Sequence, residues 1–116
     1  MFKEEKYFYR IGKEGTGLWY NKHGQFTGTI HSELSWLQIS KLEMPFEQEL
    51  VGYLSAVDNL QHLYQWFNKD EIKELQLIDG YFIEEWISTD YKFYDLYQHN
   101  VINQKTSVLN NKYHIH

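Results

Sequence analysis

The chain has 116 residues, 42% hydrophobic and 18% aromatic, which predicts one domain over residues 1–116 with its own core and argues against an intrinsically disordered protein. It has no cysteine, so disulfides, thiol catalysis and thiolate metal sites are excluded. The net charge of −5 argues against direct nucleic-acid binding, and because neither a signal peptide nor a membrane-spanning run is visible, we expect a cytoplasmic protein with no membrane partner.

Residues 6–11 (KYFYRI) are aromatic and β-branched, which predicts a strand. The next stretch, up to residue 30, is rich in glycine and predicts two more short strands, 18–21 and 25–30, separated by tight turns. A phosphate-binding loop is the alternative for these glycines. Neither the dinucleotide-binding nor the P-loop spacing is present, and no helix follows that would point its N-terminus at a phosphate, so we favour the turns.

A short helix is expected within residues 31–39, where Ser32 can cap its start. The only proline, Pro45, disfavours a helical backbone at the residue before it, so residues 40–49 (SKLEMPFEQE) are predicted to form a loop that is either mobile or faces a partner. After this loop, the compact apolar run at residues 50–56 predicts a buried strand.

Two central helices follow, because apolar residues recur there at helical spacing. The stripes are Leu60, Leu63, Tyr64 and Phe67 in the first helix, and Ile72, Leu75 and Ile78 in the second. Ser55 or Asp58 is expected to cap the first helix, and Asn68 or Asp70 the second. Gly80 is expected to end the second helix.

The C-terminal third predicts further strands. Residues 81–88 (YFIEEWIS) form one strand, and the ambiguous stretch 89–108 has its strand part at residues 100–108. The tail, residues 109–116, is either frayed or a late edge strand. Together these elements predict an α+β fold, in which short antiparallel strands and two central helices form a single compact domain.

The residue types that carry most catalytic chemistry are not grouped as that chemistry requires. The histidines have no compact metal-binding spacing, and Ser55 lacks the motif of a nucleophile elbow. Glu84 and Glu85 are consecutive on a strand, so they point to opposite faces and cannot act together as a glycosidase pair; we expect one of them to face solvent. The sequence therefore predicts no catalytic residue, no metal and no cofactor.

Arg10 is the only arginine, and it lies in the middle of an aromatic strand. An arginine there is suited to bind a phosphate or a carboxylate through two hydrogen bonds. The alternative, which we favour, is a structural ion pair with one acidic side chain or a cation–π contact with Trp19 or Tyr20.

Trp66 lies off the apolar stripe of its helix, so it either packs against a second surface or is exposed and available to bind a partner. Together with Arg10 and the aromatic and acidic residues of the glycine-rich stretch and the proline loop, it completes the set of candidate binding residues. That set is Arg10, Trp19, Tyr20, Glu43, Met44, Phe46, Glu47 and Trp66.

The segments YRIG, GLWYN and GQFTG, followed by GYLSAVDNLQHLYQWF and DGYFIEEW, resemble a group of small uncharacterised proteins of bacteriophages and prophages from low-GC Gram-positive bacteria. The resemblance extends from residue 9 to about residue 106. It implies a non-enzymatic protein-binding factor that inhibits a host defence or regulatory protein in the host cytoplasm. Such a factor acts as a monomer or a homodimer. A self-associating structural or accessory protein of a phage is an alternative.

A weaker similarity runs to ADP-ribosyltransferase-like domains, which carry a strand-borne Arg or His, a strand Ser or Tyr and a late Glu. Arg10 and Ser55 match the first two positions. This similarity implies a nucleotide-binding domain with Arg10 on a phosphate. The chain departs from the pattern at the late Glu-x-Glu, because Glu84 and Glu85 are adjacent.

Overall fold

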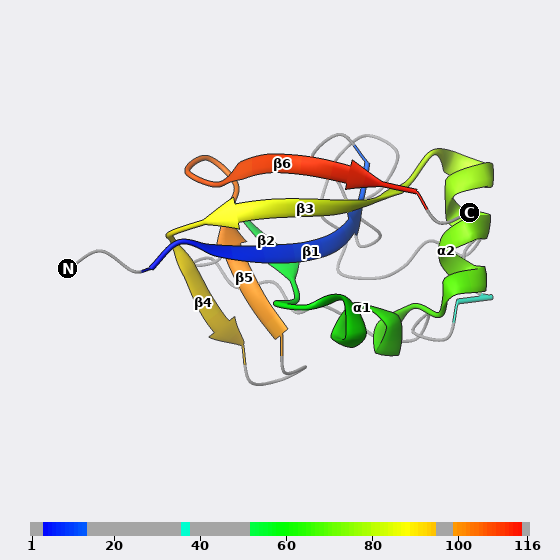
Figure 1. Ribbon diagram of the computed structural model, residues 1–116, viewed down its shortest axis with the longest axis horizontal. Helices are drawn as coiled ribbons and strands as arrows, with labels where there is room; N and C mark the ends of the chain where they lie inside the picture. Colours follow the sequence, from blue (N-terminus) through cyan, green and yellow to red (C-terminus); the bar gives the residue numbers. More distant parts are fainter. Residues whose placement is uncertain (1–3, 14–35, 38–51, 95–98, 115–116) are drawn as a thin grey trace.

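The computed structural model describes residues 4–13, 36–37, 52–94 and 99–114 (Figure 1). The predicted strands at 18–21 and 25–30 and the predicted loop at 40–49 lie outside these residues, as does nearly all of the predicted helix at 31–39. Of that helix only Trp36 and Leu37 are described, and they form a turn and a bend.

The first sheet consists of three antiparallel strands in the order β1-β3-β6. They are β1 (Lys6–Gly12), β3 (Phe82–Ser88) and β6 (Val108–Tyr113). Side chains of a strand alternate between the two faces, so the sheet has an inner and an outer face with different residues. The central strand β3 contributes to both faces and lies between β1 and β6 (Figure 1).

The second sheet, β2-β5-β4, packs against the inner face of the first. Its strands are β2 (Tyr53–Ala56), β5 (His99–Asn103) and β4 (Tyr91–Tyr94), and β4 and β5 run across the direction of the first sheet's strands (Figure 1). A core of apolar side chains joins the two sheets: Phe8, Leu54, Ala56, Trp86 and Ile102.

The two helices cover only one end of the outer face. They are α1 (Leu60–Trp66) and α2 (Lys69–Asp79). Their buried residues form a second core with Ile11 of β1 and Ile83 of β3. The predicted apolar stripes are confirmed, because Leu63, Phe67, Ile72 and Leu75 are buried and Leu60 and Tyr64 pack against them. The side chain of Ile78 lies outside the described part.

The cap of α1 corrects the prediction of Ser55 or Asp58. Asn59 caps this helix, and its side chain accepts a hydrogen bond from the backbone N–H of His62. Ser55 cannot serve because it belongs to β2, and Asp58 instead accepts a hydrogen bond from the side chain of Asn59. The second helix begins as predicted at Asn68, which forms a capping box with Glu71.

The end of α2 agrees with the sequence prediction, and the C-terminal strands agree with it in part. Gly80 ends α2 with a positive φ of 70°, a conformation that favours glycine. The ambiguous stretch contains two strands, β4 and β5, so the predicted single strand at residues 100–108 is only partly right: β5 stops at Asn103 and a turn follows. The tail forms the edge strand β6, as one of the two alternatives predicted, and the α+β fold is confirmed.

Candidate functional site

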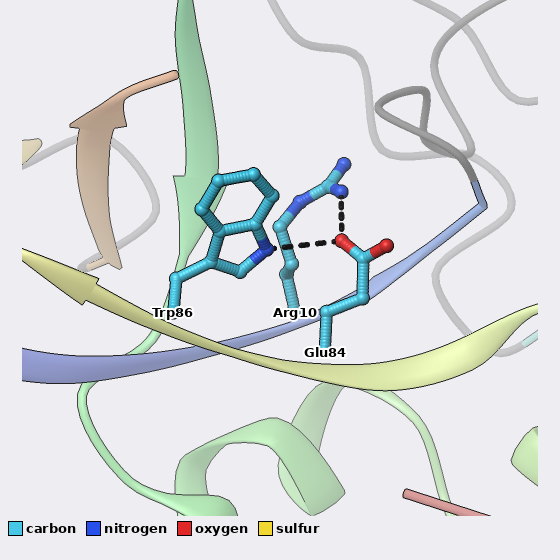
Figure 2. A network of polar contacts seen from close by, with 3 residues as sticks. All are labelled: Arg10, Glu84 and Trp86. Carbon is cyan, nitrogen blue, oxygen red and sulfur yellow. Dashed lines mark hydrogen bonds and ion pairs between the residues drawn. The ribbon is translucent and has the colours of Figure 1, made fainter. Parts of the chain in front are cut away.

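The two consecutive glutamates of β3 lie on opposite faces of the first sheet. Glu84 lies on the inner face and is 1% exposed. Arg10 is its direct partner in the register of β1 and β3 and is also buried. The Nη1 of Arg10 donates to Oε1 of Glu84 at 2.7 Å, and Nε1 of Trp86 donates to the same oxygen at 3.0 Å (Figure 2). The inner face therefore contains a carboxylate whose charge is compensated within the chain.

Gly12 provides the space that this ion pair occupies. A Cβ atom at Gly12 would collide with Nη1 of Arg10 and would lie 2.6 Å from Oε1 of Glu84. Any side chain at this position would push the two charged groups from where they are. The sequence GKEGTG thus begins with a glycine that serves the packing of an ion pair.

The structural alternative for Arg10 is confirmed, because the arginine forms an ion pair with one acidic side chain. Nη1 of its guanidinium donates to Glu84. Ser55, the other residue matched to ADP-ribosyltransferase-like domains, lies on β2 in the second sheet. This arrangement gives Arg10 a structural role in joining β1 to β3.

Glu85 lies on the outer face and is half-buried. Its carboxylate accepts three hydrogen bonds from neutral donors. The hydroxyls of Tyr9 and Tyr113 donate to Oε2 at 2.9 and 3.2 Å, and Nδ2 of Asn110 donates to Oε1 at 2.7 Å. Within the described ranges, no lysine, arginine or histidine forms an ion pair with Glu85. The charge of this carboxylate is therefore held in place, and no cation of the described residues compensates it.

The hydroxyl of Tyr9 shows the effect of this environment. Burial first, and then the hydrogen bond to Glu85 and its negative charge, raise the pKa of Tyr9 to about 12. Tyr7 and Tyr113 add smaller effects in the same direction. Tyr9 therefore stays protonated and remains a donor to Glu85 throughout the physiological pH range.

A row of apolar side chains lies next to this polar cluster. Tyr7, Ile87 and Val108 are register partners across β1, β3 and β6, and they share the face of Glu85 because Ile87 is two residues from it. Tyr7 is 54% exposed and Val108 61% exposed. We call the whole surface the outer patch; its residues are Tyr7, Tyr9, Glu85, Ile87, Val108 and Tyr113.

Trp66, a predicted binding residue, packs inside the fold. It is partly buried against the helical core, and its Nε1 donates to Nε2 of His62 at 3.3 Å. Its ring meets the edge of the His99 ring at a centroid distance of 5.3 Å. The alternative of packing against a second surface is thus confirmed. Burial, with a smaller effect of His62, lowers the pKa of His99 to about 4, so this imidazole is neutral at physiological pH.

The structure places Arg10 and Trp66 in different regions: Arg10 pairs with Glu84, whereas Trp66 packs against the helical core and His99. The other predicted binding residues, Trp19, Tyr20, Glu43, Met44, Phe46 and Glu47, lie outside the described residues. Sequence reasoning did not find the outer patch. The sequence did contain one signal for it: two adjacent glutamates on a predicted strand must point to opposite faces, so one of them was expected to face solvent.

Further properties bear on the kind of site. Among residues 4–13, 36–37, 52–94 and 99–114, no three His, Asp or Glu side chains are grouped so as to hold a metal ion. None of the helices described is both long and apolar enough to cross a membrane. Comparisons with models of protein families, with curated proteins and with solved structures found no match to the chain.

Proposed function

We propose that the protein is a non-enzymatic binding factor that holds a partner protein on its outer patch. In line with the resemblance to phage proteins, the partner proposed is a host defence or regulatory protein that is inhibited by the complex. The observation that supports this most is the outer patch itself. Exposed tyrosine and valine side chains lie there beside an ordered carboxylate, a combination of apolar and hydrogen-bonding groups typical of protein interfaces.

The face of the sheet is better suited to binding than its free edge. Between Glu85 and Trp86 the register of β3 and β6 shifts, which leaves Asn110 as an extra residue in β6. Lys112 also lies on this strand. A bulge and a lysine both hinder the pairing of an edge strand with another chain. A partner is therefore expected to pack on side chains of the outer patch.

The carboxylates of β3 favour binding over catalysis. Glu84 is buried on Arg10, and Glu85 is fixed by three hydrogen bonds on the other face. Ser88 and Ser107, the buried serines of the described part, hydrogen-bond to each other at 2.7 Å. Ser88 also exchanges hydrogen bonds with the backbone of Asp90. These contacts join the β3–β4 turn to the turn before β6, a structural role.

A photo-crosslinking residue at position 7 tests the proposed function. In lysate of the host, we expect a p-benzoylphenylalanine at Tyr7 to crosslink one protein in a one-to-one complex. The substitution Val108→Asp should abolish this product, because it places a charge in the apolar row. The matched control carries the crosslinker at Phe93, which is 62% exposed on the second sheet. Equal products from positions 7 and 93 would contradict a specific outer patch.

A further inference from the structure

We propose that the partner places an arginine side chain on Glu85. This inference rests on the proposed function, and it specifies the chemistry that a protein bound to the outer patch must present. The binding segment combines one guanidinium group with apolar side chains on either side of it. The guanidinium lies on the carboxylate of Glu85, and the apolar side chains cover Tyr7 and Val108.

The position of Glu85 beside the apolar row favours a cation in the partner. Ile87 lies two residues from Glu85 on the same face, and the row to which Ile87 belongs ends in the exposed side chains of Tyr7 and Val108. A partner that covers this row also removes water from Glu85. An ionised carboxylate that loses its water without gaining an opposite charge strongly disfavours binding. A partner that supplies the cation avoids this loss.

The geometry of the carboxylate leaves room for one more donor. A carboxylate has about four lone-pair positions. Tyr9 and Tyr113 occupy two on Oε2, and Asn110 occupies one on Oε1. One position on Oε1 therefore stays available to an N–H group, and the hydroxyl oxygens of the two tyrosines can accept further hydrogen bonds. Neighbouring acceptors of this kind suit a guanidinium, which has several donors in one plane.

The aromatic rings favour arginine over lysine. Tyr7 is more than half exposed, and its hydroxyl lies near enough to Tyr9 to contribute to the raised pKa of Tyr9. A guanidinium stacks on tyrosine rings while it donates hydrogen bonds at its edge, whereas an ammonium acts as a more strongly hydrated point charge. The same chain uses this chemistry on its inner face, where Arg10 neutralises Glu84.

A displayed library of random dodecapeptides tests the inference without a known partner. Selections are carried out against the intact protein and against two variants, Glu85→Gln and Glu74→Gln. Glu74 is exposed on α2, so its substitution changes the net charge equally but leaves the outer patch intact. We expect peptides selected on the wild type and on Glu74→Gln to be enriched in arginine between apolar residues. The enrichment should disappear on Glu85→Gln.

Affinities of a selected peptide then give the size of the effect. Replacing its arginine by citrulline, which keeps the shape and removes the charge, should weaken binding to the wild-type protein about tenfold. The same replacement should have little effect on Glu85→Gln, because a double-mutant cycle shows coupling between groups in contact. The citrulline peptide is measured on the wild type, so this result does not depend on how the variant folds.

Two outcomes would overturn the inference, and they differ in what they say of the proposed function. Peptides that bind the outer patch and are lost on Tyr7→Ser, but show no preference for arginine, would refute the arginine and leave the binding surface standing. Peptides selected equally on wild type and Tyr7→Ser would refute both. Retention of the arginine preference on Glu85→Gln would also overturn the assignment, because the cation would then lie elsewhere.

Discussion

Glu84 and Glu85 are neighbours in sequence, yet one carboxylate is paired with a cation and the other only with neutral donors. The inner carboxylate is buried and has an arginine as its partner. The outer carboxylate is held by two tyrosines and an asparagine, all neutral. A buried charge requires a partner of opposite charge within the chain, whereas a surface charge needs only to be positioned. The difference separates a structural residue from a candidate binding residue.

The largest effect is expected from Glu84→Gln. Removing the negative charge takes the carboxylate of Glu84 away from the buried guanidinium of Arg10, so the free energy of unfolding should fall by about 3–5 kcal/mol. Urea denaturation followed by tryptophan fluorescence measures this loss. The matched control is Glu85→Gln, for which we expect less than about 1 kcal/mol. Similar losses for the two variants would contradict the difference between the faces.

Replacing both residues of the ion pair by apolar residues should restore most of the stability that Glu84→Gln removes. Arg10→Met combined with Glu84→Leu removes both charges and their dehydration together, but it also removes the acceptor of Nε1 of Trp86. Its free energy of unfolding should therefore lie about 1–2 kcal/mol below that of the wild type. The measurement is again urea denaturation. A double variant as unstable as Glu84→Gln would mean that the ion pair itself, and not the burial of its charges, stabilises the sheet.

His99 is a buried titratable group that is kept neutral, in contrast to the buried, charged Glu84. Its pKa is about 4 in the folded protein and near 6.5 in the unfolded chain, so the unfolded state binds the proton first as pH falls. The contribution of His99 to stability is fully present above pH 6.5 and is lost progressively down to pH 4, by up to about 3 kcal/mol. Denaturation curves at pH 7, 5.5 and 4.5 measure this loss. His99→Asn should show a shallower dependence on pH; an unchanged dependence would exclude His99 as its source.

Gly12→Ala tests whether the space beside the inner ion pair matters. The new Cβ would collide with Arg10 and Glu84, so the free energy of unfolding should fall by about 1–3 kcal/mol. In the Arg10→Met and Glu84→Leu background the same substitution should cost less, because the charged groups are gone. Equal costs in both backgrounds would show that the alanine acts through another contact.

The smallest effect on stability is expected from Glu85→Gln, but it should be visible at Tyr9. Loss of the carboxylate removes the negative charge, one of the causes that raise the pKa of Tyr9 to about 12, and burial remains. The pKa should therefore fall part of the way to 10, as measured by the tyrosinate absorbance during an alkaline titration. In the wild type, stability due to Tyr9 is present up to pH 10 and is lost as pH rises to about 12. An unchanged titration would mean that Glu85 does not fix Tyr9.

Local patterns predicted most of the described elements. The spacing of Leu63, Phe67, Ile72 and Leu75 indicated two helices, and Asn68 and Gly80 marked the limits of the second. The prediction was wrong at the cap of α1, because Ser55 lies inside β2 and the helix begins only after Asn59. Cap geometry depends on where the preceding strand ends, and pairing with another strand decides that.

For the candidate site, the period of a strand determined from sequence alone that Glu84 and Glu85 point to opposite faces, and composition made Arg10 a rare and conspicuous residue. Only the tertiary structure decided which glutamate is buried and what surrounds each. Tyr7, Tyr9, Glu85, Val108 and Tyr113 come from three strands far apart in the chain, and sheet register brings them together. Alternation is a local property of the backbone, whereas the identity of a side chain's neighbours depends on contacts between distant segments.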